Sequence, residues 1–188
     1  MLLTFAAVLF TYWVEPCNPA KAACEKGDEQ LAEWALKAWD RAAGGGLKFT
    51  RVAQRSQALL RISWESASGG LYGEAMPIQV GDRVGAEIHV RSDLPSLGKD
   101  IAERGAKDKL FRDTIVYLTC LHESGHAIGL AHTRGFDDIM YSFQFGGDFV
   151  EYFDRYRRKL MTREDFAKNG GMSSDDEKRL KGLYPSQP

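Results

Sequence analysis

The sequence predicts a domain of the α+β class, and three observations lead to that prediction. The first half contains about five short segments with the alternating pattern of β-strands, separated by glycine-containing turns. Two longer segments, residues 28–43 and 107–129, carry apolar side chains at helical spacing. The second half has little strand character. We therefore expect a five-stranded sheet, two long helices and a smaller, mainly helical or irregular C-terminal part.

The elements of the first half follow from this periodicity and from the residues that interrupt it. Residues 1–14 are uncharged, but they lack the basic leading region of a secretory signal and are too short to span a membrane. Their end is rich in strand formers, so we expect a first β-strand there. In residues 28–43, Trp34 and Trp39 share the apolar face of a helix, and we assign both to the core instead of to a ligand platform. Further strands are expected at residues 47–52, 58–64, 72–80 and 85–91.

The second half is predicted to be helical after one irregular stretch. Residues 93–105 contain Pro95 and Gly98, and we expect a loop there. The long helix over 107–129 follows it. Ser173 is a suitable N-cap for a last helix. Further helices are expected at residues 148–160, 162–169 and 173–184.

Size and charge restrict the partners that the chain can have. A chain of 188 residues suits one domain, which buries roughly 70% of the surface that its unfolded form exposes. Hydrophobic residues make up 44% and charged residues 27%, as in ordinary globular proteins. The net charge of −1 predicts no nucleic-acid partner, and we interpret the one basic run, residues 155–159, as a solvated helix face. We expect a monomer without a stable membrane span.

The three cysteines allow more than one interpretation. Cys17 and Cys24 lie close together and could form a disulfide in an exported protein. Cys17 could instead bind a metal ion as a thiolate, although its neighbours fit that role poorly. Cys120 would point away from the side of a helix that carries His122, so we expect a buried, small apolar side chain.

The most specific feature is the stretch HESGHAIGLAH, from His122 to His132, which fits HExxHxxGxxH at all five fixed positions. On a helix His122 and His126 share a face, so both imidazoles can reach one metal ion. Gly129 can take a positive φ, which ends the helix and lets His132 return as third ligand. Glu123 lies about 100° round the helix, beside the ligands. The sequence thus predicts one catalytic zinc ion with an open fourth position.

This motif predicts hydrolysis by a zinc-activated water, with Glu123 as the general base. A chance match at five specified positions is expected on the order of once in ten thousand sequences of this size. Two other functions stay open: a proteolytically inactive, zinc-containing peptide-binding module, and a zinc hydrolase of a non-peptide amide. Glu123 argues against the binding module, because structural zinc is normally closed by four protein ligands.

With Met140 eight positions beyond His132, the motif resembles that of the metzincins, zinc peptidases marked by this pattern and a methionine turn. Within that clan the chain is most similar to the matrixins. Residues 31–52, LAEWALKAWDRAAGGGLKFTRV, resemble the first helix and following strand of matrixins, and residues 173–184 resemble their closing helix. The resemblance implies a zinc metalloendopeptidase that acts on protein or peptide substrates and is secreted or extracytoplasmic.

The resemblance also implies an architecture. One catalytic domain would cover residues 1–188, with an upper part (1–132) that holds a twisted, mostly parallel five-stranded sheet and a smaller lower part (133–188). Met140 would pack beneath the ligands as an apolar floor. The strand from Gly85 to Arg91 would be the edge of the sheet beside the cleft, where an extended substrate can add itself as another strand.

Departures from the family limit what can be transferred. His89 is the sole histidine outside the motif, so we expect no second, structural zinc and interpret His89 as an ordinary half-buried residue. Tyr141 directly follows the methionine, whereas the metal-binding tyrosine of astacins and serralysins lies two places beyond it, and we assign Tyr141 no metal role. Residues 142–172 form a longer segment than in matrixins. The clan shapes its substrate pocket there, so specificity is not transferred.

Overall fold

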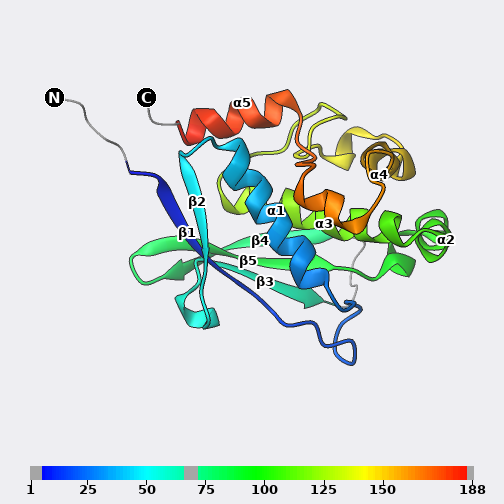
Figure 1. Ribbon diagram of the computed structural model, residues 1–188, viewed down its shortest axis with the longest axis horizontal. Coiled ribbons are helices and arrows are strands. Elements are labelled where there is room, and N and C mark those ends of the chain that lie inside the picture. The colour runs from blue at the N-terminus through cyan, green and yellow to red at the C-terminus, as the bar shows by residue number, and fades with distance from the viewer. Residues whose placement is uncertain (1–5, 66–71, 186–188) are drawn as a thin grey trace.

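The computed structural model describes residues 6–65 and 72–185, which form a twisted sheet with two long helices packed on one face (Figure 1). The described strands make a five-stranded sheet in the order β2-β1-β3-β5-β4. All neighbours are parallel except β4, which runs antiparallel to β5. The predicted α+β fold with a mostly parallel sheet is confirmed. The strands are β1 Val8–Val14, β2 Leu47–Arg51, β3 Leu60–Glu65, β4 Gly73–Val80 and β5 Arg83–Arg91, and the helices are α1 Asp28–Ala42, α2 Lys99–Lys107, α3 Lys109–Ala127, α4 Phe149–Arg157 and α5 Ser174–Leu183.

The core lies between the sheet and the two long helices, α1 and α3. In β3 the alternate residues Leu60, Ile62 and Trp64 are buried, as the period of two in a strand requires. The indole of Trp39 on α1 is fully buried, which confirms its assignment to the core, and its Nε1–H donates to the Leu121 carbonyl at 3.0 Å. Helix α1 is thereby tied to α3 one residue before the histidine motif begins.

The predicted loop over residues 93–105 is wrong, because most of it is helical. It contains a 3₁₀ turn, Leu94–Leu97, and the first part of α2. Gly105, the last residue of the predicted loop, lies inside α2. A Cβ added to Gly105 would lie 2.3 Å from Cδ1 of Leu94, so the glycine allows the turn to pack against the helix backbone.

The predicted helix over residues 107–129 is confirmed as α3, Lys109–Ala127, and Asp108 separates it from α2. This residue ends α2 and caps α3, and its carboxylate accepts a hydrogen bond from the Phe111 N–H at 3.1 Å. Asp108 also pairs with Arg157 of α4 at 2.9 Å, so the junction is held from the lower part as well. The helix predicted at 162–169 is instead a 3₁₀ turn over Arg163–Ala167.

The prediction that the strand from Gly85 to Arg91 is the edge of the sheet is also wrong. It belongs to β5, which pairs with β3 on one side and with β4 on the other. A two-residue turn, with Gly81 at φ 62°, joins β4 to β5 as a hairpin and places β4 outermost. The edge that borders the cleft is therefore β4.

The N-terminal region agrees with the sequence analysis where the structure describes it. A first strand is present at Val8–Val14, whereas residues 1–5 of the predicted stretch lie outside the described residues. Cys17 and Cys24 form a disulfide, so Cys17 is not a thiolate ligand. Cys120 is a free thiol and fully buried, as expected.

Replacing both Cys17 and Cys24 by alanine is expected to lower the free energy of unfolding by roughly 2 to 3 kcal/mol. The bridge closes a loop with a sequence separation of 7, which restricts the unfolded chain. Denaturant unfolding followed by circular dichroism measures the change. Reductant should destabilise the wild type by a similar amount and leave the double variant unaffected; equal stability of variant and wild type would contradict the prediction.

The basic run at residues 155–159 is largely neutralised by acidic neighbours. Arg155 pairs with Asp137 at 3.0 Å, and Arg157 pairs with Asp108. Arg158 pairs with a glutamate of the same helix, Glu151, at 2.5 Å. Three of the four cations of the run thus have a carboxylate partner. No helix within residues 6–65 and 72–185 has the length and apolarity needed to cross a membrane.

Candidate metal centre and cleft

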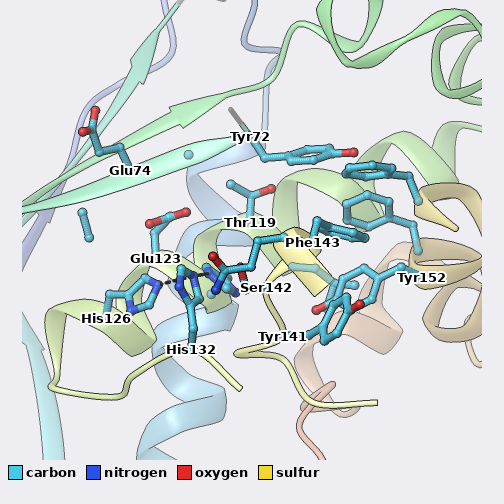
Figure 2. Close-up of a pocket in the computed structure, with 17 residues that line it drawn as sticks. Tyr72, Glu74, Thr119, Glu123, His126, His132, Tyr141, Ser142, Phe143 and Tyr152 are labelled. Carbon is cyan, nitrogen blue, oxygen red and sulfur yellow. Dashed lines mark hydrogen bonds between the residues drawn. The ribbon is translucent and has the colours of Figure 1, made fainter. Parts of the chain in front are cut away.

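The three motif histidines converge on one point. Nε2 of His132 lies 3.2 Å from Nε2 of His122 and 3.0 Å from Nε2 of His126. Nitrogen ligands at 2.0–2.1 Å in a tetrahedral zinc site are about 3.3 Å apart. In the described part of the chain this is the one group of three histidine, cysteine or acidic side chains that could hold a metal ion. Figure 2 shows two of these rings, His126 and His132, beside Glu123.

The opposite ring nitrogens show which tautomer the histidines adopt. Nδ1 of His122 lies 2.6 Å from the Ile139 carbonyl oxygen, and Nδ1 of His126 lies 2.8 Å from the Leu130 carbonyl oxygen. A carbonyl oxygen only accepts, so each Nδ1 carries the proton and each Nε2 presents its lone pair to the shared point. Imidazole nitrogens that meet in this way fit zinc, which prefers nitrogen and sulfur donors.

The turn after α3 brings the third histidine back. Gly129 has a φ of 96°, and its N–H donates to the His126 carbonyl at 2.9 Å, while the Leu130 N–H donates to the Gly125 carbonyl at 2.9 Å. This pair of bonds is a Schellman turn, which requires a left-handed residue after the helix. The predicted positive φ of Gly129 and the end of the helix there are confirmed. The same turn positions the Leu130 carbonyl against the His126 ring.

Met140 is fully buried and lies against α3 at Gly125. A Cβ added to Gly125 would lie 2.4 Å from Sδ of Met140 and 3.0 Å from Cζ2 of Trp39. A glycine between the two helical histidines is therefore needed for the methionine to pack this close. Gly125 gives no signal in the sequence, because the need for a glycine there comes from Met140 and Trp39, which are distant in the chain.

A second feature missed from the sequence is the carboxylate of Asp176, which is fully buried at the start of α5. It accepts hydrogen bonds from the Ile139 N–H at 2.7 Å and from the Ser173 N–H at 2.9 Å, and it pairs with Arg179 at 2.8 Å. The carbonyl of the same Ile139 contacts Nδ1 of His122. A capping box, Ser173 with Asp176, was the available sequence signal.

Two tyrosines that follow the methionine donate hydrogen bonds to backbone carbonyls around its turn. The Tyr152 hydroxyl donates to the Asp138 and Ile139 carbonyl oxygens at 3.1 and 3.2 Å. The Tyr141 hydroxyl donates to the Gly146 carbonyl at 2.7 Å, which agrees with giving Tyr141 no metal role.

Glu123 is buried beside the histidines and against strand β4. A Cβ on Gly73 would lie 2.7 Å from Cγ of Glu123, so only a glycine allows β4 to pass this close. Burial is the largest of the effects that together raise the pKa of Glu123 to about 7; the charge of Glu74 also raises this pKa, and Arg91 lowers it. Burial lowers the pKa of His122 to about 4, which favours the neutral imidazole that binds metal.

The histidines open into a cavity of about 480 Å³. Its histidine end is bordered by Glu123 and by Gly73, Glu74 and Ala75 of β4, and among the described residues no member of the strand from Gly85 to Arg91 lines it. The other end is aromatic (Figure 2). Its rings, none of which the sequence analysis assigned to a pocket, belong to Tyr72, Tyr141, Phe143, Phe149, Tyr152 and Phe153.

His89 lies apart from this centre, on β5. It is half-buried, as expected, and its Nδ1 lies 3.1 Å from Oγ of Ser63 and 2.5 Å from the Glu65 carboxylate. A second zinc site was not expected, and this remains a prediction.

Comparison with known proteins agrees with this geometry. The family model of the matrixins, peptidase family M10, matches residues 6–148, a range that includes the three histidines, Glu123 and Met140. The interstitial collagenase of Oryctolagus cuniculus is 29% identical over 147 residues, which cover 73% of this chain and 28% of the collagenase. The chain therefore corresponds to less than a third of that relative's length. Because the family model covers most of the chain and its signature residues meet in space, the chain belongs to the matrixin family of metzincin metalloproteases.

Proposed function

We propose that the chain is a zinc-dependent endopeptidase that holds one zinc ion through His122, His126 and His132. The observation that carries the proposal is the convergence of three Nε2 atoms at one end of a cleft, next to the buried carboxylate of Glu123. Membership of a metalloprotease family supports it.

Zinc, when bound by three neutral imidazoles, acts as a Lewis acid that polarises a peptide carbonyl and lowers the pKa of water. Glu123 accepts the proton of the attacking water at its carboxylate and returns it to the departing amine nitrogen. The carbonyls of Ile139 and Leu130 hold the rings of His122 and His126 in one tautomer. Each of these groups is held in place by packing or a hydrogen bond before substrate arrives.

The substrate is an extended peptide that adds to the outer edge of β4. Edge strands offer a row of main-chain donors and acceptors to such peptides, and β4 borders the histidine end of the cavity. Pro77 has no N–H to donate, so we expect pairing to concentrate on the part of β4 nearest the histidines. One substrate side chain then enters the aromatic end of the cavity.

Secretion is the location that we propose. The Cys17–Cys24 disulfide is stable in oxidising compartments and rare in reducing ones. A secreted or extracellular location is also usual for matrixins.

The decisive experiment is digestion of denatured casein or gelatin with and without a chelator. We expect cleavage that a zinc chelator removes and that stoichiometric zinc restores. Cleavage that continues in the chelator would contradict the proposal. The peptide-binding module predicts retention of a peptide without cleavage, and the non-peptide amidase predicts no cleavage of any protein.

A further inference from the structure

A second cavity lies outside the cleft, between helices α2 and α4, which are neighbours at one end of the molecule (Figure 1). It measures about 340 Å³, which falls within the range of about 300 to 1,000 Å³ that is usual for ligand pockets. Arg104 of α2 pairs with Asp154 of α4 at 3.0 Å and holds the two helices together. Neither the motif histidines nor Glu123 lines this cavity, so the proposed mechanism leaves it without a role.

The second cavity adjoins the cleft, and part of its lining is apolar. The apolar side chains that line it are those of Leu97, Ile101, Phe149 and Val150. Phe149, the first residue of α4, also lines the cavity that contains the histidines. A peptide that leaves the cleft past this ring therefore reaches the second cavity next. The position of the cavity thus favours the substrate chain as its occupant.

The ionisable side chains of the second cavity carry a net negative charge. Asp100 and Asp148 line it together with Lys99, whose charge is balanced by Glu103 of the same helix at 3.7 Å. Asp100 forms no hydrogen bond or ion pair with another described residue, and Asp148 uses only Oδ1 to cap α4, through the Glu151 N–H at 3.0 Å. Two carboxylates exceed the partial positive charges of the two helix N-termini, about half a unit each. The site therefore attracts a cation.

Lysine and arginine match both parts of this lining. Each has an apolar stem that can pack on the aliphatic and aromatic side chains, and a cationic head that can pair with the two carboxylates. An acidic side chain would be repelled by the same carboxylates, and a purely apolar one would gain only its burial. The chemistry of the lining therefore selects a basic side chain.

We propose that the second cavity binds a lysine or arginine side chain of the substrate, with Asp100 and Asp148 as its partners. This residue does not flank the cleaved bond, because the aromatic end of the cleft separates the second cavity from the histidines. The two carboxylates thereby make the enzyme select basic residues at a position distant from the reaction. The inference rests on the proposed function for the cleavage reaction, but not for the binding of the side chain.

The test uses peptides that carry a single arginine, norleucine or glutamate at successive positions on both sides of the cleaved bond. For the wild type we expect kcat/KM with arginine to exceed that with norleucine by about 3- to 10-fold at one position, and that with glutamate by more. This preference should decrease as salt is added, since both carboxylates are exposed. Binding of the same peptides is measured separately, by fluorescence polarisation in Glu123→Ala, where they stay intact.

Variants of the two carboxylates test their role directly. The double variant Asp100→Asn with Asp148→Asn should lose most of the preference for arginine. Asparagine is as good an N-cap as aspartate, so α4 remains capped. Asp100→Lys should reverse the preference, so that glutamate is bound and cleaved better than arginine at the same position. Such a gain for glutamate does not arise from misfolding.

Glu151→Gln is the matched control. Glu151 is an exposed carboxylate in the first turn of α4, but it lines neither cavity and pairs with Arg158. Its replacement removes the same unit of charge from the same helix as Asp148→Asn. It should leave the preference for arginine unchanged.

The outcomes separate this inference from the proposed function. If the wild type cleaves no peptide but binds arginine peptides in preference to norleucine, and the double variant does not, the second cavity is confirmed and the endopeptidase proposal fails. If peptides are cleaved and arginine gives no advantage at any position, the inference is wrong. A preference that persists in the folded double variant, or that Glu151→Gln lowers equally, would also overturn it.

Discussion

Glu123→Ala is expected to keep its zinc and lose peptide hydrolysis, with kcat reduced by about 10²- to 10⁴-fold. The carboxylate is not one of the three converging nitrogen ligands, so its removal leaves the donor set intact. It is, however, the buried carboxylate beside them, held against Gly73 of β4. Initial rates on casein, together with the zinc content of the purified variant, measure both parts of the prediction.

The variant Glu123→Gln distinguishes the role of this side chain as a proton acceptor from its role in packing. The amide fills almost the same volume next to Gly73 but cannot accept a proton from water at neutral pH. We expect the same loss of turnover in both variants. Hydrolysis at the wild-type rate in either one would show that another group is the base, and loss of zinc from both would show that the carboxylate binds the metal.

Asp176→Ala is expected to lower the free energy of unfolding by roughly 3 kcal/mol and to weaken zinc binding by about 10- to 100-fold. The change leaves the buried N–H groups of Ile139 and Ser173 without their acceptor and removes the ion pair with Arg179. It also frees the backbone at Ile139, whose carbonyl orients the His122 ring. Denaturant unfolding and competition with a fluorescent zinc indicator measure the two effects.

Two further variants test whether the buried charge of Asp176 causes the expected losses of stability and zinc affinity. Asp176→Asn keeps an oxygen for the two N–H groups but loses the charge, so we expect a smaller decrease in stability and near-normal zinc affinity. Asp175→Ala removes the neighbouring, exposed carboxylate from the same first turn of α5 and should change stability by only a few tenths of a kcal/mol. Equal effects of Asp175→Ala and Asp176→Ala would refute a specific role for the buried group.

The metal ligands could be predicted from the sequence because the information is local. His122, His126 and Gly129 lie on one helix and its terminating turn, and His132 follows within three residues, so helix periodicity and one positive φ define their arrangement. The supporting residues could not be found in this way. Asp176 accepts a hydrogen bond from the N–H of Ile139, which lies 37 residues away in the chain.

The sheet shows the same limit. Every strand was predicted near its observed position, since alternation is a local signal. The order of the strands in the sheet is not a local property. Strand β4 follows β3 in the chain, yet β3 pairs with β5, which leaves β4 outermost. Most of helix α2 was missed because Pro95 and Gly98 indicated a loop, although both precede Lys99, where the helix begins.

The aromatic end of the cleft had a sequence signal that was not interpreted. Residues 141–153 contain six aromatic side chains, five of which line the cavity. Aromatic clusters usually indicate a core, and periodicity alone does not distinguish a ring that faces a cavity from one that fills the interior. The resemblance indicated only where the pocket would lie.

The hydrogen bonds of Ile139 have a consequence for the order of events during synthesis. A nascent chain that has emerged as far as His132 already possesses all three nitrogen donors, but the carbonyl that orients His122 comes seven residues later. The carboxylate of Asp176, which anchors the backbone at Ile139, is synthesised only with α5. We therefore expect early metal capture to be weak and reversible, and retention to become tight only once the last helix has docked.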